Sequence, residues 1–238
     1  MTIWNLELRT FLRHIWQIGA IKIDIQKRFR LVHHDTDPDY PLSPIFFNFR
    51  TTDNPKSGPF TEYEVNFIGD LFWRYAKEMR LSFGGIVGVP NGGKPFAKAM
   101  VIEAYKQDGV AYPFVDLVKV RDDFGKEHVG KIIDTDDFSP ARPALAVEDA
   151  ITKATRLLET VFFFRGEGYQ IYDALVFLDR QEGGQRRLSD VGVNLYSILT
   201  MGMVVEFYFE EGFIKDPEYR AIREYREHVR KYQKQVRA

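Results

Sequence analysis

Two adjacent carboxylates, Glu148 and Asp149, come directly after an apolar run that is typical of a buried strand. Two hydroxyl residues, Thr152 and Thr155, follow them in a short loop that leads into a helix-like stretch. Free backbone N–H groups at the start of a helix favour a phosphate, and paired carboxylates can accept hydrogen bonds from neighbouring sugar hydroxyls. The segment therefore predicts a sugar-phosphate site. The alternative is an ordinary strand and turn whose two carboxylates are solvated.

The elements that must position these residues alternate along the chain. Short apolar runs lie at 86–89, 114–118, 144–147, 174–178 and 194–198, and helix-like stretches lie at 94–107, 152–165 and 200–211. This alternation predicts an α/β fold, in which helices cover both faces of a parallel, Rossmann-like sheet. Ligands of such sheets bind beyond the carboxyl ends of the strands, which is where the two carboxylates lie.

Other elements flank this alternating core. A capping box of Thr61 and Glu64, with a hydrophobic staple of Phe60 and Val65, predicts a helix that continues to about residue 80. Residues 32–58 are rich in turn formers and predict loops around one short stretch at 45–49.

Both ends of the chain have the apolar spacing of amphipathic helices, at 1–18 and 215–238. We expect the C-terminal helix to dock through its apolar stripe and to expose a basic face to solvent. A role of that face in binding RNA or a partner is the alternative.

Composition narrows the classes of function. The chain has 238 residues and a formal net charge of -1, which favours one domain and gives no general attraction to nucleic acid or to an anionic membrane. It has no cysteine, which excludes disulfides, cysteine-ligated metals and thiol nucleophiles. No apolar run is long enough to span a bilayer, and the N-terminus does not have the pattern of a secretory signal, so we expect a soluble, cytoplasmic protein.

The turn-rich segment contains residue types that can bind a metal ion: His33, His34, Asp35, Asp37 and Asp39. Adjacent histidines are poorly spaced to bind one ion together. We therefore expect a solvated loop there.

Three segments in one order resemble a known family. The acidic segment resembles the phosphoribosyl-pyrophosphate motif of type I phosphoribosyltransferases. Residues 43–48, Ser-Pro-Ile-Phe-Phe-Asn, and 178–184, Leu-Asp-Arg-Gln-Glu-Gly-Gly, resemble segments of the orotate phosphoribosyltransferase branch. The resemblance implies a type I phosphoribosyltransferase fold with an N-terminal hood and an added C-terminal helix, divided as 1–58, 59–212 and 213–238 within one domain.

The resemblance also implies roles for the matched residues. Glu148 and Asp149 would hold the ribose hydroxyls of phosphoribosyl pyrophosphate, the donor substrate. The same donor would contact two loops, comprising Ala150, Ile151, Thr152, Lys153, Ala154, Thr155 and Arg156 around its 5′-phosphate, and Asn91, Gly92, Gly93 and Lys94 around its pyrophosphate. Glycines let the second loop approach an anion closely, and Lys94 adds charge.

Phe46 and Phe47 would cover the flat ring of orotate, Thr152 would contact it, and Arg180 would pair with its carboxylate. Two structural alternatives remain at this point. The two phenylalanines could belong to the core, and Arg180 could pair with Asp179 or Glu182.

The mobile catalytic loop of the family aligns with residues 118–125, where the resemblance is weakest. Lys119 and Gly125 match, but a family lysine is replaced by Asp122 and a family histidine by Phe124. Arg121 and Lys126 lie close enough in sequence to supply the missing charge, so the catalytic residues are expected to be Lys119, Arg121 and Lys126.

Two further departures lie in the anion loops. Gly92 stands where the family has a lysine, and Ala154 stands where it has a glycine that favours a positive φ.

The resemblance thus implies an orotate phosphoribosyltransferase that uses Mg²⁺ and forms a homodimer. Its substrates would be orotate and phosphoribosyl pyrophosphate, and no membrane or nucleic-acid partner is expected. Two alternatives remain. One is a phosphoribosyltransferase for another base, and the other is a non-catalytic protein that binds the donor or a nucleotide.

Overall fold

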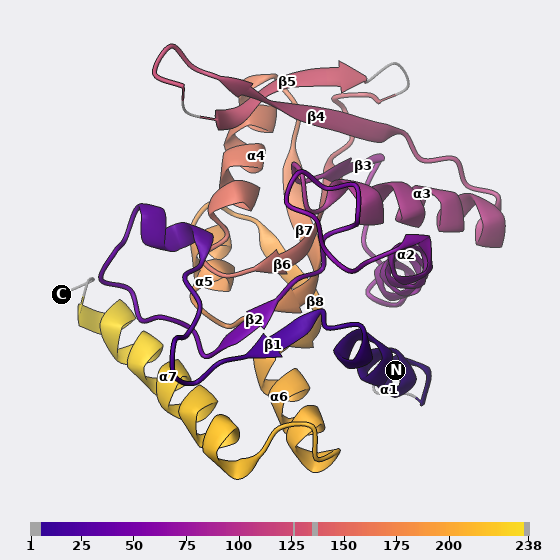
Figure 1. Cartoon of the computed structure of the whole chain (residues 1–238). Helices are drawn as coiled ribbons and strands as arrows, with labels where there is room; N and C mark the ends of the chain where they lie inside the picture. Colours follow the sequence, from indigo (N-terminus) through magenta and orange to yellow (C-terminus); the bar gives the residue numbers. More distant parts are fainter. Residues whose placement is uncertain (1–5, 126, 135–137, 236–238) are drawn as a thin grey trace.

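The computed structural model of the chain describes residues 6–125, 127–134 and 138–235. Within these residues a sheet of six strands has the order β5-β4-β3-β6-β7-β8, and a separate pair is formed by β1 and β2 (Figure 1). The strands are β1 (Ile21–Ile23), β2 (Ile45–Phe47), β3 (Gly85–Gly88), β4 (Phe114–Arg121), β5 (Glu127–Asp134), β6 (Ala144–Ile151), β7 (Ile171–Asp179) and β8 (Asn194–Thr200). All neighbours in the larger sheet are parallel except β4 and β5, which form an antiparallel hairpin.

Helices cover both faces of this sheet. They are α1 (Leu6–Gln17), the short 3-10 helix η1 (Val32–Asp35), α2 (Glu62–Glu78), α3 (Lys94–Asp108), α4 (Thr155–Gly166), α5 (Gly184–Ser189), α6 (Met201–Glu210) and α7 (Asp216–Gln235). Apolar side chains of α1, α2, α3, α6 and α7 share one buried cluster with one face of the sheet. Side chains of α4 and α5 share a second cluster with the other face. The predicted α/β fold is confirmed.

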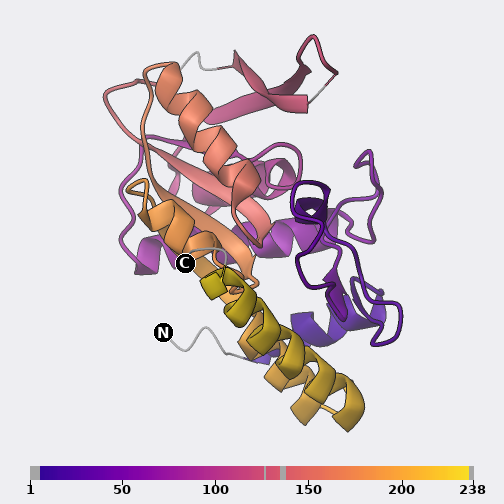
Figure 2. The same ribbon diagram turned by 90° about the vertical axis from the view of Figure 1, so that its left-hand side faces the viewer.

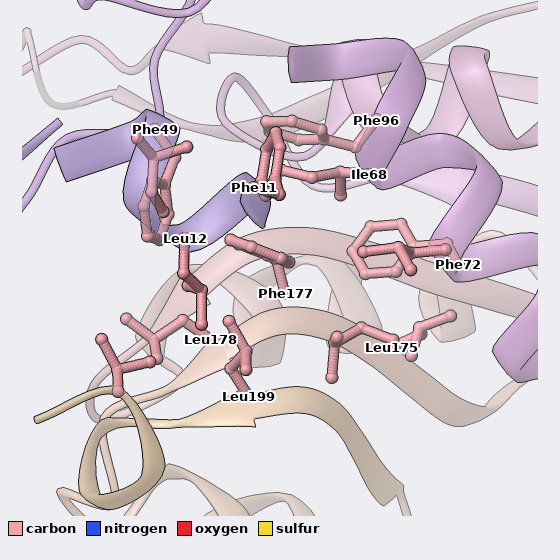
Figure 3. Close-up of a cluster of buried hydrophobic side chains, with 14 of the residues drawn as sticks. Phe11, Leu12, Phe49, Ile68, Phe72, Phe96, Leu175, Phe177, Leu178 and Leu199 are labelled. Atoms are coloured by element: carbon pink, nitrogen blue, oxygen red, sulfur yellow. The ribbon is translucent and has the colours of Figure 1, made fainter. Parts of the chain in front are cut away.

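The first cluster explains why the N-terminal region lies against the core. Phe11 of α1 contacts Phe177 of β7 in an edge-on arrangement, with ring centroids 6.0 Å apart, and Phe49 contacts the same ring at 5.2 Å (Figure 3). Aromatic contacts of this kind bury large apolar areas. The segment that carries Phe46 and Phe47 is thereby fixed beside the sheet.

The predicted strands and helices are found with small shifts at their ends. The Thr61 capping box is present, with the Thr61 N–H donating to the Glu64 carboxylate at 2.6 Å, and the helix begins at Glu62. The helix expected from residue 152 begins at Thr155, because residues 152–154 form a loop. The C-terminal helix docks as predicted, with Ile222, Tyr225 and Val229 buried.

Some elements escaped the sequence patterns. Strand β5 lies at the sheet edge and mixes polar with apolar residues, whereas continuous apolar runs were the pattern used to predict strands. Helix α5 is six residues long and rich in charge, and β1 is three residues long. Such short elements carry no resolvable period.

The expected solvated loop at 33–39 is wrong for its two histidines. His33 is 8% exposed and His34 is fully buried, and their rings stack with centroids 4.4 Å apart. Burial, with the neighbouring charge of His34, lowers the pKa of His33 to about 3, so the ring is neutral at pH 7. Apolar neighbours such as Tyr40, which packs edge-on against His33, replace the solvent.

No helix in the described part of the chain is long and apolar enough to cross a membrane.

Candidate active site

The two carboxylates lie at the carboxyl end of β6, in the middle of the sheet. Glu148 is 9% exposed and Asp149 is half-buried, so the alternative of two merely solvated carboxylates is wrong for Glu148. Burial raises the pKa of Glu148 well above its usual range, and the neighbouring Asp149 raises it further. Burial also raises the pKa of Asp149, whose carboxylate accepts a hydrogen bond from the Ala150 N–H at 2.7 Å. Among the described residues neither carboxylate has a salt bridge within 4.0 Å, and burying carboxylates without such a pair is costly, which is typical of a binding site.

The glycine loop before α3 lies directly on this pair. A Cβ atom on Gly92 would stand 2.8 Å from the Asp149 carboxylate oxygen, and one on Gly93 would stand 2.0 Å from the Val147 carbonyl. Only glycine fits at Gly93, because backbone meets backbone there. The side chain of Lys94 pairs with Asp116 of β4, at 2.5 Å between nitrogen and oxygen. The loop backbone therefore faces the acidic pair, while the Lys94 charge is held by β4.

Helices α3 and α4 both begin near the acidic pair without a side-chain cap. The residues before them, Gly93 and Ala154, accept no capping hydrogen bond, whereas Thr61 and Thr200 cap α2 and α6 with their side chains. An uncapped helix start presents free N–H groups and the positive end of the helix dipole. The two expected anion loops thus offer donors in the described structure.

The loop before α4 contains one residue in the left-handed conformation that favours glycine. Ala154 has φ +53°, in the left-handed region where a glycine is less strained. Two contacts fix the loop from the side of α5. The Gly184 N–H donates to the Thr152 carbonyl at 3.0 Å, and Arg187 donates to the Lys153 carbonyl at 2.7 Å.

Lys119, one of the three expected catalytic residues, lies close enough to Glu148 for their charges to interact. Burial lowers the pKa of Lys119, and the charge of Arg156 lowers it further, while Glu148 acts in the opposite direction. Arg156 itself pairs with Glu159 at 2.9 Å. These interactions bring Lys119, Glu148 and Arg156 together at the carboxyl side of β4 and β6.

The other two expected catalytic residues belong to the β4–β5 hairpin, which extends away from the sheet (Figure 1). Arg121 pairs with Glu127 across the hairpin at 3.2 Å and is exposed. Phe124, at the tip, is 96% exposed. Lys126 lies outside the described residues. The structure thus does not bring Arg121 to the acidic pair.

The residues expected to contact a base form a second group. The guanidinium of Arg180 is buried and donates to the Glu182 carboxylate at 2.9 Å, the Ser43 hydroxyl at 2.9 Å and the Ile45 carbonyl at 3.4 Å. It also lies over the Phe47 ring, 5.4 Å from the centroid. Arg180 therefore pairs with Glu182, as one of the two structural alternatives for this residue predicted.

Phe46 and Phe47 are half-buried and neither is part of the fully buried core. Phe46 stacks on Phe29, with ring centroids 5.6 Å apart.

Three residues of this region had no role in the site predicted from the sequence: Arg50, Asp37 and Tyr232. Arg50 lies two positions after the Ser-Pro-Ile-Phe-Phe-Asn segment, and its charge lowers the pKa of Asp149 against the larger effect of burial. The described residues offer Arg50 no ion pair within 4.0 Å. The position of Arg50 close to residues 43–48 was the feature of the sequence that could have indicated its place in the site. Asp37 and Tyr232, which contact each other at 2.5 Å, are 195 positions apart and no sequence pattern connects them.

The chain is similar in sequence to known orotate phosphoribosyltransferases. No protein-family model matches the chain. An orotate phosphoribosyltransferase of Sulfurisphaera tokodaii is 25% identical over 205 residues, which cover 86% of this chain and 95% of that protein. A uridine 5′-monophosphate synthase of Caenorhabditis elegans is 27% identical over 155 residues, which cover 65% of this chain but only 29% of that longer protein.

Solved structures match the fold. The orotate phosphoribosyltransferase of Francisella tularensis superposes with a TM-score of 0.64 at 15% identity, over 92% of this chain and 98% of that structure. The chain also matches 41% of a Leishmania donovani UMP synthase, with a TM-score of 0.65 at 15% identity. The resemblance found in the sequence is thus confirmed: the chain is related to the orotate phosphoribosyltransferases and has the type I phosphoribosyltransferase fold.

Proposed function

We propose that this protein is an orotate phosphoribosyltransferase, which transfers the phosphoribosyl group of phosphoribosyl pyrophosphate to orotate and releases pyrophosphate. One observation carries the proposal. The buried Glu148 and the half-buried Asp149 lie beside two helix starts that no side chain caps. A sugar with two neighbouring hydroxyls and anionic groups on either side satisfies both features. The relatives named above carry the same activity in their names.

The donor would span the two anion loops. Its ribose hydroxyls would donate to Glu148 and Asp149, its 5′-phosphate would lie on the N–H groups of residues 152–156, and its pyrophosphate would lie against the glycine loop. Each group then finds the partners that its charge requires.

Catalysis would rest on position and charge. Breaking the bond at the anomeric carbon leaves positive charge on the ribose and negative charge on the departing pyrophosphate, so fixed cations near the leaving group lower the barrier. Lys119 would supply one such cation, and Arg50 would supply a second, in place of the family lysine that is Gly92 here. Arg121 and Lys126 would approach when the hairpin closes over the site.

Mg²⁺ would enter with the donor. Among the described residues no group of three or more His, Asp or Glu side chains is arranged to hold a metal ion. The acidic pair and the donor's own oxygens suit an ion that keeps several of its waters. When bound, Mg²⁺ would neutralise part of the pyrophosphate charge.

Two further parts of the proposal follow from the family. The protein would act as a homodimer, with the hairpin of one copy reaching the site of the other, as in the family; Phe124 at the hairpin tip is 96% exposed, which leaves its side chain accessible to a second copy. It would act in the cytoplasm on small charged substrates.

The test is release of pyrophosphate by the purified protein with donor, Mg²⁺ and either orotate or a panel of other bases. We expect turnover with orotate, and loss of turnover in the double variant Glu148→Gln, Asp149→Asn. Turnover with orotate that survives the double variant would contradict the proposed site.

A second candidate is a phosphoribosyltransferase for another base. It is favoured by the buried Arg180, whose donors are engaged by Glu182, Ser43 and Ile45. The same panel separates the two, since this candidate predicts higher turnover with a base other than orotate.

A further inference from the structure

We infer that the C-terminal helix α7 is a positioning element for both halves of the active site. It would hold the 5′-phosphate loop through Tyr232, Asp37 and Lys153, and hold the Arg180 segment through Gln233 and Glu182. The inference rests on the proposed function, since it concerns how that site is held. It assigns a role to a helix outside the α/β core.

The first connection runs from α7 to the phosphate loop. The hydroxyl of Tyr232 donates to one oxygen of Asp37 at 2.5 Å, and the ammonium of Lys153 pairs with the other oxygen at 2.6 Å. The pair is shielded, with side-chain exposures of 20% for Lys153 and 26% for Asp37. Lys153 belongs to the loop whose N–H groups would bind the 5′-phosphate, so this chain of contacts fixes the loop against the N-terminal region.

The aromatic ring of Tyr40 lies at the centre of this arrangement. The Lys153 ammonium stands 4.0 Å from the ring centroid, and the Tyr232 ring packs edge-on against it at 5.4 Å. A cation held over an aromatic face is stabilised by the ring as well as by Asp37. Figure 1 shows the segment around η1 between the end of α7 and the start of α4, and Figure 2 shows α7 as one straight helix along this side.

The second connection runs from α7 to the base side. The Gln233 amide donates to the Glu182 carbonyl at 2.6 Å, while the Tyr40 hydroxyl donates to the Glu182 carboxylate at 3.2 Å. The other oxygen of that carboxylate accepts from Arg180. Two turns earlier, Arg226 of α7 donates to the Gln181 side chain at 2.7 Å. The segment that carries Arg180 is therefore held from α7 at two points.

The two connections leave from adjacent residues of one helix but end at different parts of the site. A helix that only added stability would affect both substrates alike when weakened. A positioning helix predicts that Tyr232 matters more for the donor and that Gln233 matters more for the base. Tyr232 reaches Lys153 through Asp37, whereas Gln233 donates to the Glu182 carbonyl and to the Tyr40 hydroxyl, which itself donates to Glu182.

The experiment uses the full chain and steady-state kinetics with donor and base varied in turn. Tyr232→Phe should raise the KM for the donor about 3- to 10-fold, with little change in the KM for the base, because it removes one hydrogen bond to a charged group. Gln233→Leu should show the reverse. Calorimetric titration of the donor alone should reproduce the first effect without any turnover.

Tyr219→Phe is the matched control. Tyr219 lies on the same helix and donates its hydroxyl to the Glu206 carboxylate at 2.5 Å, but it reaches α6 and not the site. This variant should leave both KM values unchanged. If Tyr232→Phe has no larger effect on the donor than Tyr219→Phe, the inference is wrong.

A double-mutant cycle tests the route through Lys153. In Lys153→Met the connection is already broken, so adding Tyr232→Phe should weaken donor binding no further. Additive effects would overturn the route. Tighter donor binding in Tyr232→Phe would also overturn the inference, since it would mean that Asp37 competes with the phosphate for Lys153. Absence of turnover in the wild type, with donor binding intact, would instead count against the proposed function alone.

Discussion

The donor half and the base half of the site differ in how far their polar groups are already paired. In the donor half, the helix starts at α3 and α4 have no side-chain cap, and the buried Glu148 and the half-buried Asp149 both have raised pKa values. In the base half, Arg180 already has three acceptors from its own chain. The donor half therefore depends on a ligand to complete it, whereas the base half is complete without one.

The largest expected effect is on the acidic pair. Glu148→Gln with Asp149→Asn should reduce donor affinity at least about 100-fold, because two charge-assisted contacts to the ribose are lost. Calorimetry with the donor measures this. Asp173→Asn is the control. Asp173 lies near the amino end of the neighbouring strand β7, away from the carboxyl ends that carry the site, so this variant should leave donor affinity unchanged.

The Glu148→Gln, Asp149→Asn variant should also change stability, in a direction that depends on pH. A carboxyl whose pKa is raised on folding favours the fold at low pH, and that contribution is lost as the pH rises through the raised value. At pH 7, above the ordinary carboxyl range, the raised pKa values thus cost stability, and the neutral variant should melt at the same temperature or higher. The difference should shrink as the pH falls towards the ordinary carboxyl range. A lower melting temperature at pH 7 would show that the pair is structural.

Arg180→Lys comes next and probes the base half. A single ammonium cannot keep all three contacts of the guanidinium, and losing such a contact costs about 1.5 to 3 kcal/mol. If Arg180 faces the base, the KM for the base should rise far more than the KM for the donor. If it only ties Glu182 to Ser43, both constants should move little and the melting temperature should fall.

Arg50→Ala should raise the KM for the donor about 10-fold, with Arg50→Lys recovering most of the loss, because the proposed contact with pyrophosphate needs charge more than shape. Lys56→Ala serves as the control, because it removes an exposed cation six positions further along the same segment. Equal effects of the two alanine variants would remove Arg50 from the site.

The smallest expected effect is at Ala154. Ala154→Gly relieves a left-handed conformation that costs an alanine about 1 to 2 kcal/mol, against a loss of about 0.5 to 1 kcal/mol for the flexibility of glycine. Stability should change by less than about 1 kcal/mol in chemical unfolding, with donor affinity kept. Gly192→Ala, at φ +72° in open space, should be destabilising by comparison.

The sequence predicted the donor half better than the base half. Glu148, Asp149 and the glycine loop each follow a strand, and the ends of parallel strands meet at one edge of a sheet. The pairing of Arg180 with Glu182 was foreseen only as an alternative, since a local pattern does not show which neighbour a guanidinium selects.

Other features could not be predicted because they depend on contacts between distant segments. The burial of His33 and His34 comes from Tyr40 and the neighbouring loop. The contact of Asp37 with Tyr232 needs the complete fold.

That last contact has a consequence for how the protein is made. Loop closure between residues 195 positions apart is entropically demanding and comes late in folding. A chain that emerges from the ribosome with its N-terminal end first can assemble the sheet and both anion loops before α7 is synthesised. The nascent protein would then pass through a stage with a formed donor site and an unsupported Lys153. Full function would be reached only after the last helix leaves the ribosome and docks.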